Sequence, residues 1–182
     1  MTLHAQYFAS ILDFVQSENS DICAQLSHST SDWQTKIDLL KQQFNQLPHL
    51  AGDIVLGLSQ ADSNVGIEVV ILYRGLVFPV AIDLVNQDYT EELKANIHQQ
   101  ARRLKECHLE SKSKFIVPVQ IATNATPLGG AITVSEDLVA DTMCDTGEHL
   151  AALIEHFSNQ YKDDQIILSD WLDSDYKAKL LV

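Results

Sequence analysis

The chain has 182 residues, of which 46% are hydrophobic and 20% charged, as is typical of one folded domain with a sizeable core. Its formal net charge of -13 disfavours DNA and RNA as partners, because phosphate backbones are recognised mainly by Lys and Arg. No apolar run approaches the roughly 20 residues that a membrane span needs, and residues 1–6 lack the features of a signal peptide, so we expect a cytoplasmic protein without a membrane contact.

The first fifty residues are predicted to be helical. Apolar side chains recur at helical spacing over residues 3–26, and the polar run Ser17–Ser20 favours a division into two short helices. Ser31 or Asp32 is a suitable N-cap for a further helix, which Pro48 would stop. We therefore assign residues 1–50 to N-terminal helices.

The pattern changes to strands at residue 52. Residues 53–58, 66–73 and 76–85 are rich in Val, Ile and Leu and are separated by short polar or glycine-containing turns, which predicts an antiparallel meander of three strands. Residues 89–107 then carry apolar groups at helical spacing, and residues 115–122 form a fourth strand in which Pro118 predicts an irregularity. The meander, crossover helix and returning strand predict an α/β fold with a mixed sheet flanked by helices.

Residues 124–182 are predicted to be an acidic αβ extension of the same single domain, after a core that covers residues 52–123. We expect a short strand at residues 131–134, a helix at 146–158, a second short strand at 165–168 and a terminal turn or helix at 170–176. Residues 136–175 contain eleven Asp and Glu against one basic residue, Lys162. This segment would suit a basic surface on a protein partner.

Five stretches carry a resemblance to a known family: residues 66–75 (GIEVVILYRG), 77–85 (VFPVAIDLV), 104–111 (LKECHLES), 116–123 (IVPVQIAT) and 171–176 (WLDSDY). In this order they resemble the N-terminal domain of uncharacterised bacterial proteins in which a P-loop helicase-type ATPase follows. That domain is restriction-endonuclease-like (PD-(D/E)xK), so the resemblance implies an α-β-β-β-α-β core. The sequence has no G-x-x-x-x-G-K-[ST] loop, and no nucleotide is implied.

The same resemblance identifies the candidate catalytic and metal-binding residues, Glu68 and Asp83. In nucleases of this fold, an acid on the second strand and an E-x-K on the third hold Mg²⁺ and stabilise the phosphate. Glu68 occupies the slot of the first acid, whereas the E-x-K slot holds Ile82-Asp83-Leu84, which lacks the lysine. The crossover-helix glutamine of the family is Asn96 here. Strand alternation would point Asp83 to the opposite face of the sheet unless a bulge intervenes.

Three basic residues on the crossover helix, Arg102, Arg103 and Lys105, are candidates for binding phosphates or an acidic partner. The alternative interpretation is a solvated helix face on which these cations pair with Glu106 and neighbouring acids. We favour this alternative because the negative net charge of the whole protein creates an electrostatic potential that repels phosphates.

Several further residues are expected to be structural. His108 is expected to cap or pack, and Trp171 and Tyr176 to pin the C-terminal segment to the core. The cysteines, Cys23, Cys107 and Cys144, fit no metal or disulfide pattern and are expected to be reduced and mostly buried.

Three functional hypotheses follow. The first is a non-catalytic pseudo-nuclease that binds or regulates a protein partner and needs no cofactor. The second is a Mg²⁺-dependent nuclease with a rearranged site, in which Glu68 and Asp83 hold the metal and the crossover helix supplies a basic group. The third is a subunit that works with a separately encoded ATPase. A homodimer through an exposed apolar patch is compatible with all three.

Overall fold

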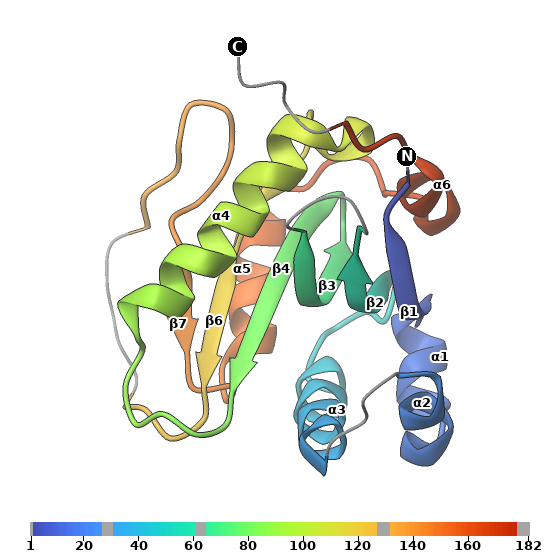
Figure 1. Cartoon of the computed structure of the whole chain (residues 1–182), viewed down its shortest axis with the longest axis vertical. Helices are drawn as coiled ribbons and strands as arrows, with labels where there is room; N and C mark the ends of the chain where they lie inside the picture. Colours follow the sequence, from blue (N-terminus) through green and yellow to red (C-terminus); the bar gives the residue numbers. More distant parts are fainter. Residues whose placement is uncertain (1, 27–30, 61–64, 127–131, 178–182) are drawn as a thin grey trace.

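The computed structural model describes residues 2–26, 31–60, 65–126 and 132–177 and has an α/β architecture (Figure 1). Its sheet has seven strands in the order β1-β2-β3-β4-β6-β7, with β5 also paired to β4. The pairs from β1 to β4 are antiparallel, and β4, β5, β6 and β7 pair in parallel. This arrangement confirms the predicted mixed sheet flanked by helices. Among the described residues, no helix has the length and hydropathy that crossing a bilayer requires.

The three central strands form the predicted meander. They are β2 (Gly52–Ser59), β3 (Gly66–Tyr73) and β4 (Leu76–Asp83). The loop between β3 and β4 has only two residues, and both have positive φ, 51° at Arg74 and 83° at Gly75. Positive φ at both positions is the type I′ geometry, whose twist matches that of the flanking strands.

Gly75 also leaves room for a second segment of backbone to cross the hairpin. A Cβ atom at this position would lie 2.6 Å from the carbonyl oxygen of Asp164, and the Asp163 amide donates to the Arg74 carbonyl at 3.0 Å. Residues 163 and 164 are therefore packed directly against the turn.

Replacing Gly75 by alanine is expected to lower the free energy of unfolding by about 2–3 kcal/mol, because strained backbone and a steric clash add together. Urea unfolding monitored by circular dichroism measures the change. Gly66→Ala is the matched control, since a Cβ at Gly66 meets no atom within 4 Å. Equal losses in the two variants would contradict the assignment of strain to the turn.

The second half of the sheet follows helix α4 (Glu91–Cys107) and the 3₁₀ turn η1 (Leu109–Ser111). The predicted fourth strand is divided into β5 (Phe115–Ile116) and β6 (Val119–Ala122), which confirms the irregularity at Pro118. Beyond it lies β7 (Met143–Asp145), and its Met143 amide donates to the Pro118 carbonyl at 2.9 Å. The proline carbonyl thus joins two parallel strands at a point where the proline itself cannot donate.

Two hydrophobic cores lie on opposite faces of the sheet. One face is covered by α1 (Ile11–Gln16), α2 (Asn19–Gln25), α3 (Ser31–Phe44) and α5 (Leu150–Tyr161), whose buried side chains meet those of the strands. The other face is covered by α4 and by α6 (Leu168–Asp173). In Figure 1, α4 crosses in front of the strands and α5 lies behind them.

The assignment of residues 1–50 to helices alone was wrong. Residues His4–Ser10 form β1, an edge strand that pairs antiparallel with β2. The apolar residues of this segment fit a helix and a strand equally well, and hydrogen bonding to β2 decides between them. Residues 10–16 and 19–25 follow the predicted division, because Ser10 caps α1 by accepting from the Asp13 amide at 3.1 Å.

The extension after residue 124 also differs from expectation. No strand forms at residues 165–168, because this segment leads into α6, and the helix predicted at 146–158 is α5 at Leu150–Tyr161. The strand predicted at residues 131–134 does not form over residues 132–134, where Val134 makes only an isolated bridge to Ala140, and residue 131 lies outside the described residues. Strand β7 was not predicted, since three residues are too few to show a period.

The C-terminal segment is held by a buried cluster of His108, Ser111 and Trp171, here called the clasp. His108 and Trp171 are 0% exposed, and their rings meet edge-to-face at 4.8 Å. The His108 Nε2 atom lies 2.9 Å from the Trp171 carbonyl oxygen, its Nδ1 atom lies 2.7 Å from Ser111 Oγ, and Trp171 Nε1 donates to that Oγ at 3.0 Å. Trp171 and the 2% exposed Tyr176 therefore pin this segment to the core, as predicted.

Candidate functional site

Glu68 lies on β3 at a point where the alternation of the strand is broken. Val69 and Ile71 pack into the core beneath α3 and α5, whereas Ile67, two residues before Val69, packs into the core beneath α4. Gly57, between the paired residues Leu56 and Leu58 of the neighbouring strand, has a φ of 66°, so the pleat is irregular in this region of both strands. This irregularity allows Glu68 to reach helix α3.

The partner of Glu68 is Lys36, on α3. Their side chains form an ion pair in which Lys36 is 17% and Glu68 24% exposed. The other carboxylate oxygen of Glu68 accepts from the Ile82 amide at 3.4 Å. Lys36 also lies 5.4 Å from the centre of the Trp33 ring. The sequence did not point to Lys36, because it is far from Glu68 in the chain and belongs to a separate predicted helix.

Asp83 ends β4 and organises the turn that follows. Its Oδ1 atom accepts from the amides of Val85 at 2.9 Å and Asn86 at 3.1 Å, and its Oδ2 atom accepts from the Asn86 side chain at 2.6 Å. Partial burial alone would raise the pKa of Asp83. The hydrogen bonds from Val85 and Asn86, with the nearby charge of Lys36, outweigh burial and hold the pKa below its usual range.

Glu68, Lys36 and Asp83 thus form a small charge cluster at one end of the central strands. Both carboxylates already have partners, and a divalent ion would have to replace Lys36 at Glu68 and Asn86 at Asp83. Within the described ranges, no group of three or more His, Cys, Asp or Glu side chains is placed to hold a metal. Groups of the protein itself therefore already contact both carboxylates.

A polar groove of about 570 Å³ adjoins this cluster. It lies between α3 and the ends of β6 and β7, with Thr35 and Thr123 at the side near the cluster. The Thr123 amide donates to the Asp83 carbonyl at 3.0 Å, which fixes the two regions relative to each other. The groove is lined mainly by amide and hydroxyl side chains: Thr35, Gln42, Gln43, Gln46, Thr123 and Thr146.

The start of α5 at the far side of the groove is already capped by acceptors. The Asp145 Oδ2 atom accepts from the amides of Gly147 at 2.7 Å and His149 at 3.2 Å, and Gln43 Oε1 accepts from the Ala151 amide at 3.1 Å. These acceptors bind amides just before and within the first turn of α5, and the Asp145 carboxylate there disfavours an anion such as phosphate.

The basic residues of α4 do not form one cationic surface. Arg102 pairs with Asp137 and with Glu106, and these partners raise its pKa. Lys105 is 7% exposed and donates to the Lys114 carbonyl at 2.6 Å, and its burial lowers its pKa. Arg103 is half-buried and has partners of its own. The geometry of Arg102 agrees with the interpretation as a helix face that pairs with nearby acids.

The cysteines are free, with Cys107 buried and Cys23 and Cys144 half-buried. Burial raises the pKa of the Cys144 thiol, so it is a weaker nucleophile than an exposed cysteine.

Searches of protein family models, of curated proteins and of solved structures find no match to this chain.

Proposed function

We propose that this protein is a non-catalytic binding or regulatory protein, built on a nuclease-like domain whose cleavage site has been lost. The observation that carries the proposal is the state of the two acids in the slots suggested by the family resemblance. The charge of Glu68 is balanced by its ion pair with Lys36. The carboxylate oxygens of Asp83 accept hydrogen bonds from the Val85 amide and the Asn86 side chain, in the turn that follows β4. Carboxylates used in this way hold the fold together, and a metal ion would compete with these partners for them.

The charge of the protein supports a partner that is a protein rather than a nucleic acid. The net charge is -13, and Arg102 on α4 is held by Asp137 and Glu106. A negative surface of this kind repels phosphate backbones and attracts basic protein surfaces.

The test is a titration of Mg²⁺ and Mn²⁺ by calorimetry, with a nuclease assay on plasmid and single-stranded DNA from the same preparations. We expect no binding heat and no cleavage for the wild type. Three variants are compared with it: Glu68→Ala, Lys36→Met and, as a matched control on the surface, Glu110→Ala. Lys36→Met frees Glu68 from its ion pair, so it offers a metal the best opportunity to bind.

The competing hypothesis, a Mg²⁺-dependent nuclease, makes the opposite prediction. Wild-type protein would bind the metal and cleave DNA, and both properties would disappear in Glu68→Ala and persist in Glu110→Ala. Metal binding that appears only in Lys36→Met would support the proposal, because it would show that Lys36 closes a former site. The third hypothesis, a subunit of a complex with a separate ATPase, remains compatible with the proposed function.

A further inference from the structure

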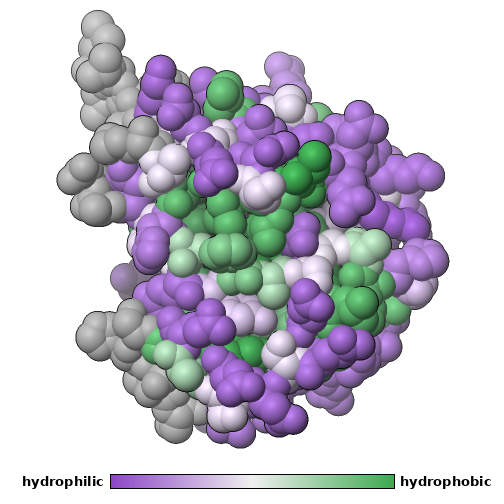
Figure 2. Space-filling view, turned by 90° about the vertical axis from the view of Figure 1, so that its right-hand side faces the viewer, coloured by the Kyte–Doolittle hydropathy of each residue, from purple (hydrophilic) through white to green (hydrophobic). Residues whose placement is uncertain are grey.

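Strand β1 is a free edge of the sheet with an apolar groove beside it. Among the described residues, β1 pairs with β2 on one side only. Phe8 on this strand is 55% exposed, and Ile167, in the segment before α6, is 62% exposed. Figure 2 shows hydrophobic residues gathered on the side of the molecule where β1 and α6 lie. A free edge with adjacent apolar side chains is the structure that β-strand addition uses.

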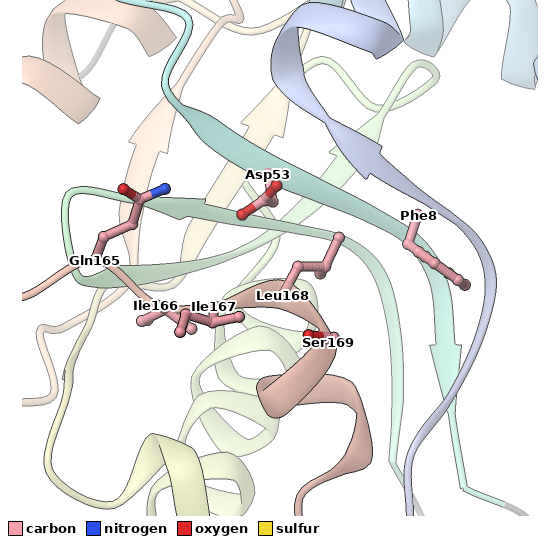
Figure 3. Close-up of a pocket in the computed structure, with 7 residues that line it drawn as sticks. All are labelled: Phe8, Asp53, Gln165, Ile166, Ile167, Leu168 and Ser169. Atoms are coloured by element: carbon pink, nitrogen blue, oxygen red, sulfur yellow. The ribbon is translucent and has the colours of Figure 1, made fainter.

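The groove has a volume of about 500 Å³ and is lined by Phe8, Asp53 and residues 165–169. Figure 3 shows Phe8 on β1 and Asp53 on β2 on one side, and Ile166, Ile167 and Leu168 on the other. Asp53 is thus a carboxylate within an apolar surface. In the part of the chain that the structure describes, no side chain or backbone amide pairs with this carboxylate, and burial raises its pKa.

The charges around the groove favour a cationic occupant. Exposed Asp164 and Asp170 flank the lining segment in the sequence, and the net charge of the chain is -13. A second copy of this chain would bring the same negative charge to the interface. A lysine or arginine would instead form an ion pair with Asp53, and it would lose part of its hydration against the apolar walls.

We propose that β1 binds an extended peptide segment of a partner protein, and that this segment carries a lysine or arginine two residues from an apolar side chain. The segment adds to the sheet through the backbone of β1. Its apolar side chain packs on Phe8 and Ile167, and its cation pairs with Asp53. The inference rests on the proposed function as a binding protein, for which it names a surface and the chemistry of the partner.

The register of β1 explains why the two side chains are two residues apart. Ser10 is opposite Asp53, and Phe8 is opposite Val55, so Phe8 and Ser10 lie on the same face. Side chains two apart on an added strand lie on one face as well. Because Ser10 is small, a long cationic side chain can pass over it toward Asp53 on β2, two strand spacings or about 9.6 Å from the added strand, and the Asp53 side chain covers part of this distance.

The experiment measures binding of a peptide with fluorescein on its N-terminal amine, fluorescein-Thr-Val-Thr-Arg-Thr-Val-Thr-amide, by fluorescence anisotropy. The same peptide with citrulline in place of arginine has the same shape without the charge. We expect wild-type protein to bind the arginine peptide, and Asp53→Asn, Phe8→Ser and the citrulline peptide each to weaken binding by about tenfold. The surface controls Asp141→Asn and Val85→Ser should bind as the wild type does.

Three results would overturn the inference. The first is no binding of the arginine peptide to folded wild-type protein. The second is binding that Asp53→Asn and Phe8→Ser leave unchanged. The third is a wild-type dimer in light scattering that Phe8→Ser dissociates, which would assign the edge to a second copy. The metal titration is independent of all three, so a failure of the peptide site and a failure of the pseudo-nuclease proposal are distinguishable.

Discussion

Replacing Trp171 by alanine is expected to lower the free energy of unfolding by about 4 kcal/mol, the largest effect of any single substitution considered for this protein. The Trp171 side chain is 0% exposed and packs against the His108 ring at 4.8 Å. Its removal leaves a cavity, and Ser111 loses the hydrogen bond that Trp171 Nε1 donates at 3.0 Å. The cavity and the lost hydrogen bond both disfavour the folded state.

Urea unfolding measured by far-ultraviolet circular dichroism gives this loss directly. Ile167→Ala is the matched control, because Ile167 immediately precedes α6 and is 62% exposed. The free energy of unfolding of Ile167→Ala is expected to differ from that of the wild type by no more than about 0.5 kcal/mol. A loss below about 1.5 kcal/mol for Trp171→Ala would mean that the C-terminal segment contributes little to the stability of the core.

Acidification is expected to remove about 3 kcal/mol of stability through His108 alone. Burial lowers the pKa of His108 from the usual 6.5 to about 4, while the Trp171 carbonyl acts in the opposite direction. The unfolded chain therefore binds a proton that the folded chain excludes between these two values. The contribution of neutral His108 to the free energy of unfolding has its full value above pH 6.5. It decreases as the pH falls from 6.5 to 4 and is lost below pH 4.

The hydrogen-bond network of the clasp determines which nitrogen of His108 carries the proton of the neutral ring. The Trp171 carbonyl can only accept, so His108 Nε2 carries the proton, and His108 Nδ1 accepts from the Ser111 hydroxyl. The Ser111 oxygen in turn accepts from Trp171 Nε1. A second proton on His108 Nδ1 would require the Ser111 hydroxyl to rotate its own hydrogen away and give up the hydrogen bond that it donates to Nδ1.

The measurement compares unfolding free energies at several values between pH 4 and pH 8 for the wild type, His108→Gln and His4→Gln. Protonation of carboxylates makes the net charge of -13 less negative in all three proteins and changes the stability of each. Only differences in the free energy of unfolding between the three proteins are therefore informative. The wild type should have a much larger free energy of unfolding than His108→Gln at pH 7, and this difference should decrease as the pH falls. His4 is exposed, and its variant should follow the wild type. A constant gap for His108→Gln would contradict the exclusion of the proton.

Much of the fold could be predicted because local patterns and tertiary structure agree there. The Val- and Ile-rich strands around Arg74-Gly75 pair with their neighbours in the chain, so turn chemistry alone determines their order. Pro118 interrupts its strand because proline has no amide hydrogen to donate, a property that is visible from this one residue. Trp171 and Tyr176 are large side chains in an otherwise acidic segment, and the core is the natural place for them.

The edge strand could not be predicted in the same way. Tyr7 and Phe8 are adjacent apolar residues, which one face of a helix or the two faces of a strand accommodate equally well. Only pairing with β2, about fifty residues later in the chain, selects the strand. Phe8 then remains 55% exposed, a result that an amphipathic helix pattern would not suggest.

The candidate site shows a similar limit. The resemblance of its strand to the family identified Glu68 as a candidate residue. The break in strand alternation opposite Gly57 and the ion pair with Lys36 could not be identified in this way, because they depend on contacts between distant elements. Asp83 is different, because its partners Val85 and Asn86 follow within three residues. An aspartate that ends a strand before an asparagine is a local turn signal, and it could have indicated a structural role from the sequence alone.

The clasp also has a consequence for the order in which the chain folds. It joins His108 and Ser111 to a tryptophan 63 and 60 residues later. Closing such a long loop costs more entropy than joining the strands of the meander, whose connections are short. During synthesis the end of α4 emerges well before Trp171, so the pocket around His108 stays open until Trp171 itself has been made. Contacts that form this late mainly slow unfolding and have little effect on the rate of folding.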